Sequence, residues 1–184
     1  SRVLFVGSSQ TWGAGTQTWN GTFPMRIQEH LNKELSPRTD MRYESINTGI
    51  SGHRSYQLYD FYESDWVDLN PVVTVINLST NDRDPIRFKE SLLKFIALNR
   101  EKGIQTILVQ EANSIEPNPD ERHENHIVIR NVALKQKIRL IAAHQYLQQQ
   151  HDTGFLWWDT VHPTSYGYQL LAQTIGDAVV RALE

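Results

Sequence analysis

The chain has 184 residues, a length within the usual range for one domain, and we expect residues 1–184 to form a single domain. A hydrophobic fraction of 39% predicts a folded core, whereas a net charge of -3 gives no basic surface for binding nucleic acid. The absence of cysteine excludes disulfides, thiol nucleophiles and thiolate metal sites. No window approaches the roughly 18 consecutive apolar residues that a membrane-spanning helix needs.

The chain begins at Ser1, directly before an apolar run, with neither an initiator methionine nor the charged and apolar regions of a signal peptide. A mature domain, or one excised from a longer protein, would begin in this way. For such a domain of bacterial type we expect an extracytoplasmic location, and otherwise a cytoplasmic one. The sequence leaves the compartment and the oligomeric state open.

The first part of the chain alternates strand and helix patterns. Residues 3–6 form a short apolar run ended by Gly7, as in a buried parallel strand. Residues 22–35 carry apolar side chains at helical spacing. Residues 41–46 predict a second strand, and residues 56–62 predict a short helix.

The alternation continues along the middle of the chain. Residues 72–78 (VVTVINL) are apolar and β-branched on both faces, which predicts the central strand of a parallel sheet. A helix over residues 87–101 follows, with Gly103 as its expected C-cap. Residues 106–110 predict a fourth strand.

Residues 125–150 have an ambiguous pattern that fits either one long helix or three elements. We favour a helix to about Gln136, a strand at residues 138–141 and a second helix from Ala142. A fifth strand continues the alternation, and a single helix of that length would be unusual. The last helix is expected to begin near Ser165, a plausible N-cap, and to run to the end of the chain.

This order of elements predicts an α/β fold. We expect a three-layer α/β/α sandwich, flavodoxin-like, around a central parallel sheet of about five strands. In such sheets, ligands bind at the carboxyl ends of the strands. Ser9, Gly52 and Asn81 each fall just after a predicted strand, so we expect all three at this edge of the sheet.

An acid and a histidine lie three residues apart just before the last predicted helix. A histidine can take the proton of a serine hydroxyl, and an acid bound to its other ring nitrogen fixes the tautomer. Pro163 favours an extended backbone at His162, so Asp159 and His162 can lie side by side in the turn. The same spacing also occurs in solvated loops, so the pair alone does not establish a catalytic site.

The candidate residues elsewhere also have ordinary structural roles. Ser9 fits an N-cap or loop serine, and Gly52 fits a glycine needed for a positive φ angle. Asn81, which is followed by an aspartate, fits a turn after a strand. Each residue alone leaves these alternatives open.

Four segments together resemble the conserved blocks of the SGNH hydrolases, the GDSL family of esterases and lipases. The segment GSSQTWG, from Gly7, is similar to G-D-S-x-x-x-G, and NTGISGHRS, from Asn47, is similar to the second block. LSTND, from Leu78, is similar to G-x-N-D, and DTVHPTSYGYQLLA, from Asp159, matches D-x-x-H. The blocks occur in family order across nearly the whole chain.

The resemblance implies a role for each matching residue. Ser9 would attack the ester carbonyl, His162 would take its proton, and Asp159 would orient His162. The backbone N–H groups of Ser9 and Gly52 and the side-chain amide of Asn81 would hold the oxyanion. The resemblance implies neither a metal nor an organic cofactor.

Two positions depart from the family pattern. Ser8 stands in place of the usual aspartate of the first block, and Ser79 stands in place of the usual glycine of the third. The aspartate is neither nucleophile nor base in the family, so its loss leaves the catalytic residues intact. The hydrogen bonds that it would make, and the shape of the pocket beside Asn81, are the features that these departures affect.

Three further side chains are candidates for contacting the substrate. Trp12 lies between Ser9 and the trailing glycine of the first block, and Trp158 directly precedes Asp159. Glu111 follows the fourth predicted strand and is expected in a loop near the edge of the site. Tryptophan is also a common core residue, so at least one ring of the pair at positions 157 and 158 is expected to pack inward.

A polar stretch near residue 123 is the alternative place for a metal. Its candidate ligands are Asp120, Glu121, His123, Glu124 and His126. The stretch contains no recognised ligand motif, so we expect a solvated loop that helps to frame the pocket.

The sequence thus predicts a serine esterase that works through an acyl-enzyme. A short-chain or O-acetyl ester of a carbohydrate is the favoured substrate, because aromatic residues lie near the site and no long apolar lid segment is present. The alternatives are a lysophospholipase or thioesterase acting on longer acyl chains, a polysaccharide O-acetyltransferase domain, and a non-catalytic carbohydrate-binding domain. The last has no need for Ser9, Asp159 and His162 together.

Overall fold

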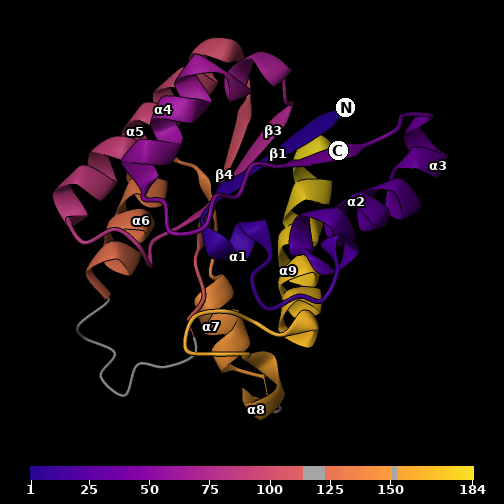
Figure 1. The fold of residues 1–184 in the computed structure, drawn as a ribbon. Coiled ribbons are helices and arrows are strands. Elements are labelled where there is room, and N and C mark those ends of the chain that lie inside the picture. The colour runs from indigo at the N-terminus through magenta and orange to yellow at the C-terminus, as the bar shows by residue number, and fades with distance from the viewer. Residues whose placement is uncertain (114–122, 151–152) are drawn as a thin grey trace.

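The central feature of the fold is a parallel sheet, seen in a computed structural model that describes residues 1–113, 123–150 and 153–184 (Figure 1). The described strands are β1 (Arg2–Gly7), β2 (Glu44–Asn47), β3 (Val73–Leu78), β4 (Gln105–Gln110) and β5 (Arg139–Ile141). They lie in the order β2-β1-β3-β4-β5, and each neighbouring pair is parallel. The predicted α/β fold with a sheet of five strands is confirmed.

The strands that follow β1 in the chain lie on both sides of it, β2 on one side and β3 to β5 on the other. The chain passes from β1 to β2 on one side and then crosses to β3 on the other side of β1. In open parallel sheets the crevice at such a switch point, outside the carboxyl ends of the strands, is where ligands bind. The residues that follow β1 and β3, including Ser9 and Asn81, therefore lie at this crevice.

Helices cover both faces of the sheet (Figure 1). The α-helices are α1 (Ser9–Trp12), α2 (Phe23–Glu34), α3 (Ser36–Thr39), α4 (Ser55–Ser64), α5 (Pro85–Lys102), α6 (His123–Gln136), α7 (Ala143–Gln148), α8 (Thr153–Leu156) and α9 (Ser165–Leu183). Two short 3-10 helices are η1 (Trp19–Gly21) and η2 (Trp66–Leu69). Helices α2 and α9 pack on one face, and α4, α5 and α6 pack on the other.

The side chains of β1 show how the two cores divide. Val3 and Phe5 belong to the core beneath α2 and α9, while Leu4 and Val6 belong to the core beneath α4 and α5. Successive strand residues point to opposite faces, so a strand that is apolar throughout must be covered on both sides. The predicted three-layer α/β/α arrangement is therefore confirmed.

The broken pattern predicted for residues 125–150 is also confirmed, with α6, β5 and α7 in that order. Gly103 follows α5 in the left-handed conformation, as expected of a C-cap. The N-cap of α9 is Thr164 rather than Ser165, because the Thr164 side chain accepts a hydrogen bond from Gly167 N.

The second strand is shorter than the predicted residues 41–46 and begins only at Glu44. Asn32 of α2 explains this difference, because its side chain bonds both backbone groups of Tyr43. Tyr43 N donates to Asn32 Oδ1 at 2.9 Å, and Asn32 Nδ2 donates to Tyr43 O at 2.8 Å. A helix side chain thus replaces the strand partner at this position.

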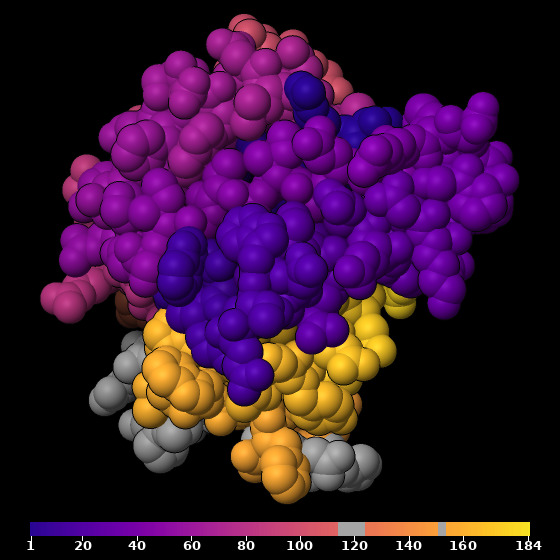
Figure 2. All heavy atoms as spheres, turned by 45° about the vertical axis from the view of Figure 1, so that its right-hand side comes forward, coloured from indigo at the N-terminus to yellow at the C-terminus, as the bar shows by residue number. Residues whose placement is uncertain are grey.

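The segment after β1 and the segment before α9 come together at the sheet edge that carries the site. Figure 2 shows the indigo N-terminal segment directly against the orange segment that precedes α9. Tyr168 Oη donates to Ala14 O at 2.7 Å, and a Cβ added to Gly15 would lie 2.4 Å from Pro163 O. This close packing holds the segment after β1 against the segment that carries Asp159 and His162.

Among the described residues, none of the helices combines the length and apolar character needed to cross a membrane.

Candidate active site

Three side chains from the two ends of the chain form one line of hydrogen bonds. His162 Nε2 lies 2.8 Å from Ser9 Oγ, and His162 Nδ1 lies 2.7 Å from Asp159 Oδ2. An ionised carboxylate only accepts hydrogen bonds, so Nδ1 carries the proton and Nε2 is left to accept from the serine hydroxyl. The arrangement can move a proton from the serine to the histidine.

Asp159 accepts hydrogen bonds from its own loop. Its Oδ1 accepts from the backbone N–H groups of Val161 at 2.8 Å and His162 at 2.7 Å. Trp158 N donates to His162 O at 2.9 Å and closes the turn. Partial burial alone would raise the pKa of Asp159, but the hydrogen bonds from His162 and the backbone outweigh it and hold that pKa below its usual range.

Ser9 is presented by a tight turn at the end of β1. The turn depends on Gly7, where an added Cβ would lie 1.9 Å from Thr11 Oγ1 and 2.7 Å from Asn77 O. Gly13 N then donates to Ser9 O at 2.9 Å and ends α1 after one turn. Ser9 is therefore the first residue of a short helix that lies very close to the sheet. This close approach is possible only with a glycine at position 7.

The loop that carries Gly52 comes after β2 in the chain and is hydrogen-bonded to the end of β1. Thr48 N donates to Phe5 O and Ile50 N donates to Gly7 O, both at 3.0 Å. Gly52 itself is exposed with a φ of 77°, and an added Cβ would meet nothing within 4 Å. Glycine is required here by the backbone conformation and not by packing.

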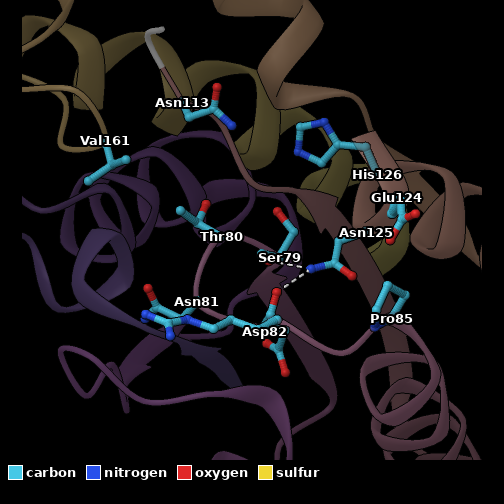
Figure 3. A pocket seen from close by; sticks show the side chains of 11 residues that line it. Ser79, Thr80, Asn81, Asp82, Pro85, Asn113, Glu124, Asn125, His126 and Val161 are labelled. Carbon is cyan, nitrogen blue, oxygen red and sulfur yellow. Dashed lines mark hydrogen bonds between the residues drawn. The ribbon is translucent and has the colours of Figure 1, made fainter. Parts of the chain in front are cut away.

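Asn81 lies in the loop after β3, and its amide is held by the Gly52 loop. Asn81 Nδ2 donates to His53 O at 3.0 Å, which leaves a second hydrogen on the same nitrogen for another acceptor. One side chain of α6 bonds the backbone of this loop at two points. Asn125 of α6 donates from Nδ2 to Ser79 O at 2.9 Å and to Asp82 O at 2.7 Å (Figure 3).

Asp82 anchors the other end of this loop to α4. Its carboxylate accepts from Ser55 Oγ at 2.6 Å and from Ser55 N at 3.1 and 3.2 Å. Burial raises the pKa of Asp82, although the hydrogen bonds from Ser55 oppose the shift. The loop with Asn81 is thus fixed at both ends by buried polar contacts.

Comparison with known proteins places this geometry in a family. Residues 5–170 match the model of the GDSL-like Lipase/Acylhydrolase family. The chain belongs to this family. The resemblance seen in the four sequence blocks is therefore confirmed, and the protein is a carboxylic ester hydrolase of the GDSL type.

Solved structures share the fold over nearly the whole chain. The acetyl xylan esterase AlAXEase is 26% identical, with a TM-score of 0.81 over 97% of this chain and 100% of its own. LAE5, an alpha/beta hydrolase enzyme from the metagenome of Lake Arreo in Spain, is 22% identical, with a TM-score of 0.80 over 100% and 96%.

A two-domain esterase (CEX) active on acetylated mannans is 18% identical, with a TM-score of 0.80 over 98% of this chain. This chain spans only 48% of that protein. No curated protein matches the sequence.

Glu111 does not lie where its position after the fourth predicted strand had suggested. It is not at the edge of the site but buried beneath it, with 1% of its surface exposed. Its Oε1 accepts from Ser8 Oγ at 3.2 Å, and its Oε2 accepts from Ser79 N at 2.9 Å and Thr80 N at 2.7 Å. The prediction that Glu111 contacts the substrate is corrected, because both carboxylate oxygens face the protein.

The two candidate tryptophans lie on the surface of the hydrolase. Trp12 is 53% exposed and Trp158 is 67% exposed. The Trp158 ring lies 6.3 Å from the His162 ring. Trp157, by contrast, is partly buried and packs against the core beneath α9, as expected for one ring of this pair.

A row of rings beside the Gly52 loop was not singled out from the sequence. The ring centroids of His53 and Phe61 are 6.1 Å apart, and those of Phe61 and Trp66 are 5.6 Å apart in a stacked arrangement. Phe61 is 44% exposed. The i, i+8 spacing of His53 and Phe61 across the start of α4 gave no distinctive signal.

The stretch considered for a metal is described only in part. Asp120, Glu121 and the side chain of His123 lie outside the described residues. Glu124 and His126 belong to the first turn of α6 and not to a solvated loop, and His126 Nε2 donates to Glu111 O at 3.0 Å. In the described ranges, no three His, Asp or Glu side chains are grouped to hold a metal.

A cavity of about 470 Å³ opens between α6 and the loop after β3 (Figure 3). Its walls are mainly polar and include Thr80, Asn81, Asn113, Asn125 and Val161. The cavity lies beside Asn81, the candidate oxyanion donor, and is bordered by the residue that precedes His162. The polar stretch near residue 123 was expected to frame the pocket as a loop. Among the described residues, the start of α6 and the loop after β3 line the cavity instead.

Proposed function

We propose that this hydrolase cleaves short acyl esters, above all O-acetyl esters of carbohydrates, through an acyl-enzyme on Ser9. The observation that carries the proposal is the unbroken line from Ser9 Oγ to His162 and Asp159, with both hydrogen bonds below 3 Å. The line provides a nucleophile, a base and an orienting acid at one place. These residues come from positions 9 to 162, which also supports the proposal that the chain acts as one domain.

Acylation follows from this geometry. His162 Nε2 takes the proton as Ser9 Oγ bonds to the ester carbonyl carbon, and the carbonyl oxygen gains the negative charge. Asp159, ionised because its pKa is lowered, stabilises the imidazolium. His162 then gives the proton to the departing alcohol as the C–O bond breaks, which leaves the acyl group on Ser9.

The oxyanion has three candidate donors at the switch point of the sheet. They are Ser9 N, Gly52 N and the second amide hydrogen of Asn81. The His53 carbonyl holds the first amide hydrogen of Asn81 and so orients the second. Deacylation repeats these steps with water, whose proton His162 takes before returning it to Ser9.

Two features of the surface support a carbohydrate substrate. Exposed rings flank the site, with Trp158 beside His162 and Phe61 beside the Gly52 loop. Aromatic faces with large exposed area suit the apolar faces of sugar rings. The AlAXEase structure, named as an acetyl xylan esterase, and the esterase named as active on acetylated mannans give further support.

The cavity beside Asn81 argues against a long acyl chain. A site for a long hydrocarbon tail is expected to be lined mainly by apolar side chains. Here the walls carry Asn113, Asn125 and Thr80. The lysophospholipase and thioesterase alternatives are therefore less favoured than a short acyl ester.

The test compares hydrolysis of p-nitrophenyl acetate and decanoate, and acetate release from acetylated xylan and mannan. We expect the acetate ester to be preferred, and Ser9→Ala to abolish activity while the exposed Ser64→Ala control keeps it. A strong preference for decanoate would contradict the proposed substrate class. Wild-type activity in Ser9→Ala would contradict the mechanism, and acetylated sugar products formed with a sugar acceptor would indicate transfer in place of hydrolysis.

A further inference from the structure

Ser8 occupies the position where the first family block usually has aspartate, and it lies against an acid from another part of the chain. Ser8 is 1% exposed, and its Oγ donates to Glu111 Oε1 at 3.2 Å. Glu111 directly follows β4 and is equally buried. The turn that presents Ser9 therefore still has a carboxylate beneath it. This carboxylate comes from the residue after β4 and not from position 8 of the turn itself.

The second oxygen of Glu111 reaches the loop on the other side of the site. Oε2 accepts from Ser79 N and Thr80 N, the two residues before Asn81. All three partners of the carboxylate are donors, which matches the acceptor capacity of an ionised group. One buried side chain thus bridges the residue before Ser9 and the residue before Asn81.

The backbone around Glu111 is itself fixed. Glu111 O accepts from His126 Nε2 of α6 at 3.0 Å. The next carbonyl, Ala112 O, accepts from the amide of Gln10 in α1, and the same amide donates to Val161 O at 2.6 Å. A carboxylate on so constrained a backbone can define the position of the loops that it bonds.

We propose that Glu111 is a positioning residue that takes the place of the aspartate of the first block and sets the Asn81 amide relative to Ser9. The inference rests on the proposed function, since it concerns the donor and the nucleophile of that reaction. Glu111 touches neither the substrate nor the reacting atoms. It acts through the backbone of Ser79 and Thr80 and through the hydroxyl of Ser8.

The pairing of Ser8 with Glu111 explains why aspartate is absent from position 8. An aspartate there would place a second carboxylate against the buried Glu111, and two buried like charges at this distance repel strongly. A serine hydroxyl can instead donate to the carboxylate. The substitution Ser8→Asp should therefore be harmful while Glu111 is present and helpful when it is absent.

The experiment measures kcat and KM on p-nitrophenyl acetate for Glu111→Ala, Glu111→Gln, Ser8→Asp and the double variant Ser8→Asp/Glu111→Ala. We expect Glu111→Ala to lower kcat about 100-fold with KM within threefold, because a displacement of about 1 Å in a donor costs that much. Glu111→Gln, whose amide oxygen can still accept from both N–H groups, should keep about a tenth of kcat or more. Ser8→Asp should lower kcat at least tenfold alone and raise it at least tenfold in the Glu111→Ala background.

A matched control and a readout without catalysis complete the design. Glu101→Ala removes an exposed acid at the end of α5 and should leave kcat and KM unchanged. The amide proton signals of Ser79 and Thr80, followed by NMR, should move upfield in Glu111→Ala, because both N–H groups lose a carboxylate partner. This signal reports the contact whether or not the protein hydrolyses the chosen ester.

Each outcome decides one of the two proposals. Absence of esterase activity in the wild type would overturn the proposed function, while unchanged Ser79 and Thr80 signals would overturn the role of Glu111. A folded Glu111→Ala variant with kcat within threefold of wild type would overturn it as well. If Glu111→Ala does not fold, a wild-type kcat in the folded Ser8→Asp variant overturns the inference, and a tenfold loss at unchanged KM supports it.

Discussion

The two halves of the site are built in different ways. On the base side, Asp159, His162 and the backbone of Val161 bond one another within a single turn, and the Asp159 side chain is 39% exposed. On the donor side, the Asn81 loop depends on partners from four other segments. They are His53, Ser55, Glu111 and Asn125.

This difference decides how each half should respond to substitution. A turn held by its own backbone can lose a side chain and keep its shape. A loop held by buried side chains from elsewhere shifts when one of them is removed, because each leaves an unpaired polar group behind. Chemical effects should therefore dominate on the base side, and positional effects on the donor side.

The largest expected effect is on the base side, in His162→Ala. We expect kcat on p-nitrophenyl acetate to fall about 10⁴-fold or more, because no base remains to take the Ser9 proton. KM and the thermal unfolding midpoint should change little, since the turn is held by backbone bonds. His30→Ala, on the far α2 surface, is the control. A loss below tenfold would show that His162 is not the base.

Next in size is Asn81→Ala on the donor side. Loss of one oxyanion donor is expected to lower kcat about 10²- to 10³-fold with KM within a few fold, because the donor acts mainly in the transition state. Steady-state kinetics on the same ester would check this, with the exposed Asn131→Ala as control. An effect confined to KM would mean that Asn81 binds the substrate in its ground state.

A smaller effect is expected from Asn125→Ala, which touches no reacting atom. The change leaves Ser79 O and Asp82 O without their amide donor, which should cost about 1–3 kcal/mol of unfolding free energy. We also expect kcat to fall about tenfold as the Asn81 loop loosens. Chemical denaturation and kinetics on one sample would measure both. A loss of stability with full kcat would show that α6 does not position the loop.

The same contrast explains what the sequence could predict. The fold followed from alternating apolar segments, and β3 and the division of residues 125–150 followed from burial on both faces and from element length. The Asp159/His162 pair was visible because its geometry is contained in four consecutive residues. Ser9, Gly52 and Asn81 were found by their places after strands and by the resemblance of their blocks.

The contacts on the donor side could not be predicted in this way. Glu111 is 32 residues from Ser79 and 103 from Ser8, and no spacing in the sequence relates them. An acid after a strand usually faces solvent, so burial beneath the site was not expected. The start of β2 was misplaced for a similar reason, because Asn32 of another element bonds Tyr43.

The smallest expected effect concerns stability against pH, and its sign should differ between the two sides. The pKa of Asp159 is lowered in the fold, so its contribution to stability is present above the unfolded value near pH 4 and is lost as the pH falls through the folded value. Burial raises the pKa of Glu111, so the wild type loses stability as the pH rises from the unfolded value, about 4.3, to the folded one.

Guanidinium unfolding between pH 3 and pH 8 can separate these contributions. The stability of wild type relative to Asp159→Asn should increase with pH in the acid range, while its stability relative to Glu111→Gln should decrease over the range just above. Constant offsets between variants cancel, because only the slopes with pH are compared. Slopes of equal sign would contradict the proposed contrast between the two acids. In that contrast, local hydrogen bonds stabilise the charge of Asp159, whereas the burial of Glu111 makes its charge unfavourable for stability.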